Sequence, residues 1–593
     1  MGCAGCVEGP RADARRVRTA HDSAFRSGGD DVSDVTFTFE GHAVAARNGQ
    51  TVGAALAAAG QVALRETRAD GARGIFCGMG VCQECLVTID RMPNRRACLE
   101  PARNGIDVRR QAFPGEPPGA SRGTPPIGFA DLAVERADVV VIGGGAGGLA
   151  AAVAARGCGL DVLLLDERST AGGQYFKQPA AALREPALDR QQAEGAALRR
   201  RAERAGVRVL DGAEVVTALD AGAVLVTRAG RAFVAQGRAL VVATGAYERG
   251  VPLPGWTLPG VMTTGALQTL WRSYRALPGR RILIAGNGPL NLQVACETID
   301  AGASVVAVAE AAPLASGDRL GPLTRMALAD PVLAATGGGY LARLGRQSRL
   351  RLGVVCRRVE SSLAGGLRVE IGPAAGGPGE SHDVDIVALG YGFQPSNELL
   401  RALGCAHDWD ERAGMLRTRR NASCETTVSG VFAVGDCCGL GGAPAAQAEG
   451  TISGVALGRA LGGAVTVALA QEADRAARDL ARHRQFQAAL WDAFAAPRLG
   501  LSLAAADTVV CRCEDVRKAE LLAGAADGDP SIGDVKRRTR CGMGRCQGRY
   551  CGPALAEHLA AQGGRPLDER AFFAPRGPVK PVTIADLVGG GER

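Results

Sequence analysis

Four cysteines between residues 77 and 98 have the spacing of a metal centre. They are Cys77, Cys82, Cys85 and Cys98, in the pattern C-x4-C-x2-C-x12-C. Four thiolates that converge in this way can hold a cluster of two irons. Gly78 and Gly80 allow the loop backbone to curl around such a cluster, so that its amides reach the sulfurs. The spacing therefore predicts a [2Fe–2S] site. Zinc is the alternative, although zinc usually prefers two short C-x2–4-C pairs.

A second group of cysteines lies in the last hundred residues. It comprises Cys511, Cys513, Cys541, Cys546 and Cys551, spaced C-x-C-x27-C-x4-C-x4-C. Two of these thiols lie in a glycine-rich loop, which favours a second iron–sulfur site. We predict that the first four are the ligands, with Cys551 as the other candidate for the fourth position. A zinc site and a site that is never filled remain open. The 18 cysteines of the chain are clustered, which indicates metal binding rather than disulfides.

Between the two cysteine groups lies a dinucleotide-binding pattern. Val139–Ile142 is a continuous apolar run, as expected of a strand buried on both faces, and Gly143-x-Gly145-x-x-Gly148 follows it. Gly143 allows a tight turn, Gly145 lets the backbone approach a pyrophosphate, and Gly148 lets helix and strand pack closely. A helical stretch then presents its N-terminus to the phosphates. This context predicts a bound dinucleotide rather than a glycine-rich turn of another kind.

A second apolar strand, residues 160–165, leads to the acid that should bind the ribose. Asp166 and Glu167 are both candidates. We prefer Glu167, because four residues separate it from the next glycine pair, as in glutathione-reductase-like flavoproteins. Gly173 and Gln174, in that second motif, are predicted to contact the same cofactor.

Two later motifs complete the pattern of a flavin domain. Strand 240–243 runs into Thr244-Gly245, and strand 431–434 ends in Gly435-Asp436. In flavoproteins with two dinucleotide folds, the first turn closes the cofactor domain, and the aspartate binds the ribityl or pyrophosphate part of FAD. The order of all these motifs is more specific than any one of them.

A second dinucleotide fold begins at Arg281. Its loop is Gly286-x-Gly288-x-x-Asn291, so asparagine replaces the third glycine, and its second strand ends at Glu310. An acid at that position favours NAD over NADP, because it repels a 2′-phosphate. The fold is therefore a candidate NAD site, and a purely structural role is the alternative.

These motifs divide the chain into nine segments. We predict a disordered tail (1–33), a plant-type [2Fe–2S] ferredoxin domain (34–110), a linker (111–134), the first part of an FAD-binding domain (135–276), a second, NAD-type dinucleotide fold (277–395), the second part of the FAD-binding domain (396–465), a helical connector (466–506), a bacterioferritin-associated-ferredoxin-like [2Fe–2S] domain (507–560) and a C-terminal arm (561–593). The fold class is α/β, a glutathione-reductase-like flavoprotein with an N-terminal β-grasp domain and a small helical C-terminal domain.

Composition excludes several classes of function. Only 4% of the residues are aromatic, and the net charge of +8 comes from scattered arginines, so we expect no nucleic-acid partner. No apolar run is long enough to span a membrane, and we expect no secretory signal. We expect a cytoplasmic protein, with attachment to the membrane surface through a complex as a further option. The six histidines lie outside every motif, and no acid/base pair suits amine oxidation. We therefore predict no catalytic residue.

The motifs together resemble the hydrogen cyanide synthase, opine (octopine/nopaline) oxidase and sarcosine oxidase alpha-subunit families. CGMGVCQECLVTID and RRAC are similar to the small ferredoxin subunit of hydrogen cyanide synthase. VVVIGGGAGGLAAA, PLPGWTLPGV and CRCE…RCGMGRCQGRYCG are similar to the opine oxidase A subunit, and also to the middle subunit of hydrogen cyanide synthase. Since the small and middle subunits are separate chains in the cyanide synthases, the present chain resembles their fusion.

The resemblance implies FAD, two [2Fe–2S] clusters and a partner subunit related to D-amino-acid oxidase that oxidises the amine. This chain would then carry electrons from that partner to a quinone or another acceptor. A flavin takes two electrons and a [2Fe–2S] cluster takes one, so the cofactor set itself favours electron transfer. A self-contained NADH-dependent reductase is the second hypothesis, because of Glu310. An iron or redox sensor is the third.

Overall fold

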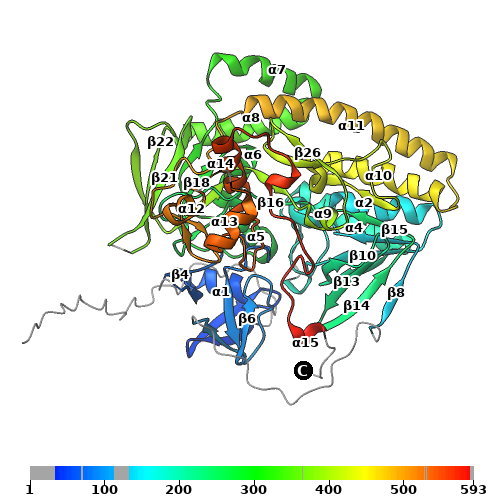
Figure 1. Ribbon diagram of the computed structural model, residues 1–593, viewed down its shortest axis with the longest axis horizontal. Helices are drawn as coiled ribbons and strands as arrows, with labels where there is room; N and C mark the ends of the chain where they lie inside the picture. Colours follow the sequence, from blue (N-terminus) through cyan, green and yellow to red (C-terminus); the bar gives the residue numbers. More distant parts are fainter. Residues whose placement is uncertain are drawn as a thin grey trace, which may run out of the picture.

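The computed structural model describes residues 34–68, 71–112, 132–183, 185–363, 365–526, 528 and 530–587. The predicted disordered tail, with Cys3 and Cys6, lies outside these residues, and so does most of the predicted linker. Figure 1 shows the N-terminal module in blue below the larger α/β body, with the long helix α11 (Val467–Ala493) above it.

The N-terminal module is a five-stranded sheet with one helix packed on it, as the sequence predicts. Strands β1 (Asp34–Phe39) and β2 (His42–Arg47) form an antiparallel hairpin, and the sheet order is β2-β1-β7-β5-β6. The other strands are β5 (Leu86–Ile89), β6 (Met92–Arg96) and β7 (Asp107–Arg110). Helix α1 (Val52–Ala58) begins at Thr51, whose hydroxyl accepts a hydrogen bond from the Ala54 amide. It buries almost all of its small apolar residues against this sheet.

The first dinucleotide fold is built on a parallel sheet of order β11-β10-β9-β15-β28. Its strands are β9 (Val139–Ile142), β10 (Val162–Asp166), β11 (Arg208–Asp211), β15 (Ala239–Val242) and β28 (Val431–Ala433). The central strands are buried on both faces, which explains their unbroken apolar sequence. Strand β28 comes from a late part of the chain and pairs with β15, so the chain returns to complete this sheet.

Helices cover the first fold. Helix α2 (Ala146–Gly157) follows β9, and α10 (Gly442–Ala460) lies against it. The contact is close because Gly450 and Gly454 of α10 meet the backbone of α2, where an added Cβ would lie 2.2 Å from the Gly147 oxygen and 2.6 Å from the Ala151 oxygen, respectively. A second, four-stranded sheet flanks this fold, in the order β12-β13-β14-β8. Its strands are β8 (Val134–Arg136), β12 (Glu214–Ala218), β13 (Ala223–Arg228) and β14 (Arg231–Gln236).

The second dinucleotide fold has the same design. Its parallel sheet has the order β17-β24-β18-β19-β20, from β17 (Val261–Thr263), β18 (Arg281–Gly286), β19 (Ser304–Glu310), β20 (Leu350–Leu352) and β24 (Ile386–Gly390). Helices α5 (Thr264–Tyr274) and α6 (Pro289–Asp300) cover it. The short strands β16 (Ala246–Glu248) and β25 (Phe393–Pro395) pair with each other and connect the two folds.

The C-terminal module is small and mostly helical. It contains β29 (Val509–Cys511), β30 (Val516–Arg517), α12 (Lys518–Gly524), α13 (Ile532–Thr539) and α14 (Gly552–Gly563). Helices α12 and α13, in orange, lie above the blue N-terminal module in the view of Figure 1. Among the described residues, no helix is both long and apolar enough to cross a membrane.

Candidate cofactor and iron–sulfur sites

The motifs predicted to hold FAD gather at one edge of the first parallel sheet. Gly143 follows β9, Thr244 follows β15 and Gly435 follows β28, and these neighbouring strands all end at the same edge. In open α/β sheets this carboxyl edge is where ligands bind. Sequence positions almost three hundred residues apart are thus brought to one site, as the order of the motifs predicts.

At this edge the loop glycines lie so close to neighbouring backbone atoms that there is no room for a side chain. A Cβ on Gly143 would lie 2.4 Å from the Ala243 oxygen, and one on Gly148 would lie 1.9 Å from the Gly143 oxygen. A Cβ on Gly173 would lie 2.7 Å from the Cα of Gly145, so the two glycine motifs touch. Such a bare backbone surface at a helix N-terminus fits a pyrophosphate, which needs amide donors and close approach. Gln174 lies beside it in the short helix α3 (Gly173–Phe176).

The two candidate ribose acids occupy different positions. Asp166, the last residue of β10, is buried and accepts hydrogen bonds from the amides of Gly144 (2.5 Å) and Arg168 (2.8 Å). Burial raises the pKa of its carboxyl to about 6. Glu167, which the sequence favours, points instead to an ion pair with Lys580 of the C-terminal arm. The geometry therefore favours Asp166 as the acid that faces the glycine loop.

The motifs on β15 and β28 are held by local hydrogen bonds. The Thr244 hydroxyl donates to the Ser396 oxygen (2.6 Å), and Gly245 has φ +69°. Asp436 accepts hydrogen bonds from the amides of Gly441 and Gly442, both at 2.9 Å, at the N-terminus of α10. The Gly435 amide donates to the buried Glu449 carboxylate (2.8 Å). These contacts order the loops that face the cofactor edge.

In the second fold, the residues that would meet a nucleotide are bound to one another. The Glu310 carboxylate accepts hydrogen bonds from the Gly288 amide (3.0 Å), the Asn287 amide group (2.8 Å) and the Ala312 amide (2.9 Å). It is fully buried, and burial raises its pKa to about 7. Gly286 lies at the end of β18, where a Cβ would meet the Gly390 oxygen at 2.0 Å.

A buried polar network that the sequence does not reveal lies between the two folds. The Lys177 ammonium donates to the Gln268 side-chain oxygen (3.0 Å), and burial lowers its pKa to about 7. The nearby Glu248 accepts from the Gly265 amide (2.8 Å), and burial raises its pKa to about 7. Each follows a cofactor motif, Lys177 after Gly173-Gln174 and Glu248 after Thr244-Gly245. That adjacency was the only sequence signal, because the two residues are 71 positions apart.

The four N-terminal cysteines form one buried group. The Cys82 amide lies 3.3 Å from the Cys77 sulfur, and the Cys98 amide lies 3.5 Å from the Cys85 sulfur. Although burial disfavours a thiolate, hydrogen bonds from the Cys82 thiol and from loop amides lower the pKa of Cys77 to about 6. Gly78 and Gly80 have φ of +61° and +78°. The curled loop and its inward amides suit a thiolate-bound cluster.

The C-terminal cysteines are also gathered, with one addition to the predicted set. The sulfurs of Cys511, Cys541 and Cys551 lie within 4.8 Å of one another. Cys513 and Cys546 are hydrogen-bonded to each other. Hydrogen bonds from Cys541 and Cys551 lower the pKa of Cys511 to about 3, against the effect of burial. The five thiols thus form a group of three that contains Cys551 and a pair, Cys513 with Cys546, so the predicted fourth ligand Cys546 and its alternative Cys551 lie in different groups. This set of soft donors fits an iron–sulfur cluster.

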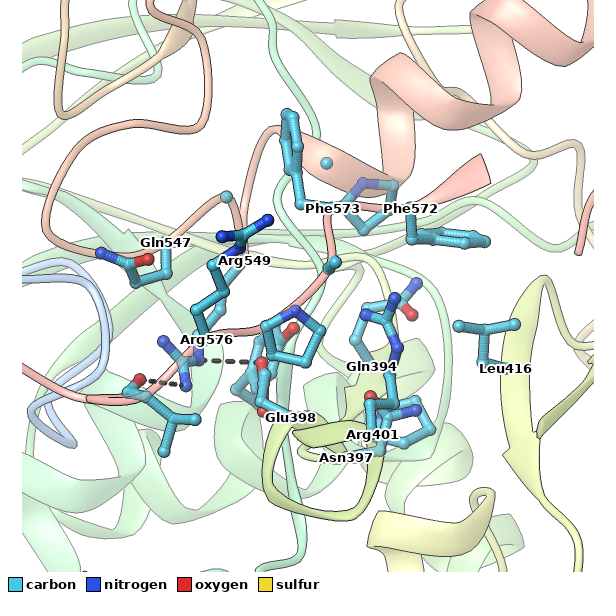
Figure 2. A pocket seen from close by; sticks show the side chains of 18 of the residues that line it. Gln394, Asn397, Glu398, Arg401, Leu416, Gln547, Arg549, Phe572, Phe573 and Arg576 are labelled. Atoms are coloured by element: carbon cyan, nitrogen blue, oxygen red, sulfur yellow. Dashed lines mark hydrogen bonds and ion pairs between the residues drawn. The ribbon is translucent and has the colours of Figure 1, made fainter. Parts of the chain in front are cut away.

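A pocket between the C-terminal module and the first fold is lined by Gln547 and Arg549 from the module and by Glu398 and Arg401 from the other side (Figure 2). Arg549 crosses it and donates to Glu398 (2.9 Å) and to the Val579 oxygen (3.0 Å). The C-terminal arm forms one wall with Phe572 and Phe573. The arm therefore connects the C-terminal module to the flavin fold.

Comparison with known protein families identifies three kinds of domain in the chain. The family of 2Fe-2S iron-sulfur cluster binding domains matches residues 33–112. The pyridine nucleotide-disulphide oxidoreductase family matches residues 137–337 and 346–450, and the BFD-like [2Fe-2S] binding domain family matches residues 509–561. The chain therefore has two [2Fe–2S] domains and one FAD domain.

Whole-length relatives extend this picture. The opine oxidase A subunit of Agrobacterium tumefaciens is 33% identical over 76% of this chain and 91% of its own length. Hydrogen cyanide synthase subunit HcnB of Pseudomonas aeruginosa is 32% identical over 75% of this chain and 97% of its own. Subunit HcnA of the same organism is 44% identical over 14% of this chain and 77% of its own. The fold matches L-proline dehydrogenase from P. horikoshii with a TM-score of 0.69 at 18% identity, covering 94% of this chain and 98% of that one.

The fold and the three centres define a flavin-dependent iron–sulfur oxidoreductase. The chain belongs to the pyridine nucleotide-disulphide oxidoreductase family and, within it, to the type that includes the opine oxidase A subunit and HcnB of hydrogen cyanide synthase. The predicted fold class and cofactor domains are confirmed.

Proposed function

We propose that this chain is the electron-transferring subunit of a heteromeric dehydrogenase for amino acids, imino acids or opines. A partner subunit related to D-amino-acid oxidase would oxidise the amine at its own flavin. The present chain would receive the electrons and pass them to a respiratory acceptor such as a quinone. The relatives are named as subunits, and the HcnA-like and HcnB-like parts are joined here in one chain, which supports this role.

The observation that carries the proposal is the convergence of both cysteine modules on the flavin protein. Cys77 and Cys82 of the N-terminal module share one buried apolar cluster with Cys546 of the C-terminal module. Tyr247 and Trp256, from the segment that follows Thr244-Gly245, lie in the same cluster. Three redox centres are thus held in one body, as is required of a converter between two-electron and one-electron steps.

The chain's own residues would bind and orient these groups. The bare glycine backbone and Asp166 would hold the dinucleotide part of FAD, and the buried thiols would hold two clusters. FAD supplies two-electron redox chemistry when it is bound. The Lys177 and Glu248 side chains, each with a pKa near 7, could hold or release a proton beside the flavin fold.

An anaerobic titration of the purified holo-chain with NADH tests the proposal. Flavin absorbance and the iron–sulfur EPR signal are followed together. We expect no change with NADH and full reduction of all centres by dithionite, because electrons would come from the partner subunit. Full dehydrogenase activity of the chain alone, without any partner, would contradict the proposal.

The second candidate is a self-contained NADH-dependent reductase. The second dinucleotide fold and the acid Glu310 at the end of β19 favour it. In that case NADH would bleach the flavin, and the cluster signals would grow in proportion. The same titration therefore separates the two functions.

A further inference from the structure

The loops that carry the two cysteine groups touch each other through one arginine. Arg512 stands between Cys511 and Cys513, and its side chain is 3% exposed. Its guanidinium carbon lies 3.9 Å from the centre of the Phe76 ring and 4.7 Å from that of Trp256. Phe76 directly precedes Cys77. A cation of the C-terminal site is therefore held between an aromatic ring of the N-terminal site and one of the flavin protein.

The position of Arg512 is fixed by hydrogen bonds as well as by the rings. Its guanidinium donates to the Trp256 carbonyl oxygen (2.6 Å), and the Trp256 indole donates to the Val509 oxygen (2.6 Å) on β29. The Phe76 carbonyl accepts from the Thr263 amide (2.8 Å), which fixes the Phe76 segment against the flavin protein. The contact is therefore built from three parts of the chain that are far apart in sequence.

The charge of Arg512 is balanced from the N-terminal site. Glu84, which lies between Cys82 and Cys85, has its carboxylate 3.5 Å from the Arg512 Nε. The Glu84 side chain is 1% exposed, so the pair interacts in a poorly screened environment. Glu84 also faces Arg65 at 3.2 Å and Arg73 at 3.8 Å.

The same charge network crosses back to the C-terminal module. Arg73, on the short strand β4 (Ala72–Arg73), pairs with Asp515 at 2.7 Å. In Figure 1, β4 lies beside the orange helices of the C-terminal module. Buried charges of this kind are costly unless each has partners, and here the partners come from both cysteine modules.

Apolar contacts close the remaining space between the two sites. Tyr550, next to Cys551, has its ring centre 5.3 Å from that of Phe76. Phe76 in turn meets Trp256 edge to face at 5.6 Å. Cys513 packs against the cluster that contains Cys77 and Cys82. Packed side chains thus lie between the two thiol groups.

We propose that Arg512 is a positioning residue that joins the two [2Fe–2S] sites into one electron-transfer unit, and that its charge raises the reduction potential of both clusters. The inference rests on the proposed function to the extent that both clusters carry electrons. In the transfer it serves, one electron leaves one cluster, which is oxidised, and enters the other, which is reduced. No bond forms or breaks. A positive charge beside both sites favours the reduced, more negative state of each.

The experiment is an EPR-monitored redox titration of the full holo-chain, wild type against Arg512→Gln. We expect both clusters to become harder to reduce. At a fixed ambient potential the ratio of reduced to oxidised cluster should fall about tenfold at each, which is about 59 mV for a one-electron centre. With both clusters reduced, the magnetic interaction between the two EPR signals should weaken as the loops separate.

Charge and position are separated by further variants. Glu84→Gln should shift both potentials upward, and the double variant Arg512→Gln/Glu84→Gln should return them toward wild type. Arg512→Lys keeps the charge and should restore the potentials more fully than the magnetic interaction, because lysine lacks the planar guanidinium.

Arg540→Gln is the matched control. Arg540 directly precedes Cys541, but its side chain is 60% exposed and pairs with Glu514 (2.8 Å). It should shift the potential of the C-terminal cluster weakly and that of the N-terminal cluster not at all.

If Arg512→Gln keeps its iron and shifts the potential of one cluster only, or of neither, the inference is wrong. If Arg512→Gln loses iron, Glu84→Gln becomes the test. A shift in the reduction potential of fewer than two clusters then refutes the inference. Reduction by NADH would overturn the proposed function and leave these outcomes readable.

Discussion

The two dinucleotide folds of this chain have the same elements but different glycine loops. In both, a central parallel strand leads through a loop into a helix, β9 into α2 and β18 into α6. In both, an acid ends the neighbouring strand beside the first loop glycine. In the second fold, Glu310 is the strand partner of Gly286. In the first fold, Leu165 is the strand partner of Ile142, so the next residues, Asp166 and Gly143, lie side by side.

The difference lies at the third loop position. In the first fold Gly148 has no room for a Cβ, because one would lie 1.9 Å from the Gly143 oxygen. In the second fold Asn291 occupies this position, and its side chain hydrogen-bonds two neighbouring segments. Its amide donates to the Gly390 oxygen (2.9 Å), and its oxygen accepts from the Thr264 hydroxyl (2.8 Å). The next helix also begins with Pro289, which offers no amide. The same fold can thus leave loop backbone bare for a cofactor, or use a side chain to hydrogen-bond the neighbouring polar groups.

Exchanging the third residue should give the largest effect. Gly148→Asn places a side chain where the backbone already touches, so we expect flavin content below about a tenth of wild type and a lower thermal midpoint. Flavin absorbance per chain measures it. Asn291→Gly is the matched control and should retain the flavin. Equal loss of flavin from both variants would mean that the two loops do not differ in their role.

Exchanging the acids should have the next largest effect. Asp166→Asn removes a charged acceptor that faces the glycine loop, which typically costs about 1.5–3 kcal/mol, or roughly a 10- to 100-fold loss of FAD affinity. Glu167→Gln removes only a partner of Lys580 and should change affinity less than about threefold. FAD titration of deflavinated chain measures both. A larger loss with Glu167→Gln would identify Glu167 as the ribose acid, as the sequence predicts.

Removing the Asn291 side-chain hydrogen bonds should destabilise the second fold without changing the predicted flavin site of the first fold. Asn291→Ala leaves the buried Gly390 oxygen and the Thr264 hydroxyl without their partner, which typically costs about 2 kcal/mol. We expect a lower thermal midpoint, unchanged flavin content and unchanged iron. Thermal unfolding followed by circular dichroism measures the shift. Loss of flavin from this variant would show that the two folds are not independent at this position.

Local patterns in the sequence predicted the elements and the positions of the cofactor and cysteine motifs along the chain, and long-range geometry determines how these motifs meet. The apolar runs of β9 and β10, the glycine loop and the cysteine spacings are local, so they could be read directly. The choice between Asp166 and Glu167 depends on strand register, which counting back from the Gly172-Gly173 pair does not determine. Cys551 lies near Cys511 because the loop between Cys541 and Cys551 turns at Gly542 and Gly548, with φ of +83° and +81°.

Contacts between distant parts of the chain could not be predicted from the sequence. Arg512 is an ordinary residue of a C-x-C motif when only the sequence is considered, and Trp256 and Phe76 lie hundreds of positions before it. The meeting of Lys177 and Glu248 likewise requires both folds to be assembled.

A pH dependence should also distinguish the second fold. Burial raises the pKa of Glu310 from its usual 4.5 to about 7, so the folded chain binds this proton more tightly than the unfolded chain. Stability should therefore fall as the pH rises from about 4.5 to about 7, by up to about 3 kcal/mol, and the contribution should level off above that range. Glu310→Gln cannot ionise and should lack this slope.

The measurement is the difference in thermal midpoint between wild type and Glu310→Gln from pH 5 to pH 8. Wild type should have its greatest relative advantage at pH 5, where Glu310 is protonated in the folded chain, and should lose that advantage by pH 8. Glu360→Gln, an exposed acid on β21 (Val355–Ser361), should show a constant difference across the range. A slope of the opposite sign would mean that ionised Glu310 stabilises its loop. The second fold would then hold its acid as a charge, as a nucleotide-binding acid requires, and would differ less from the first than its loop implies.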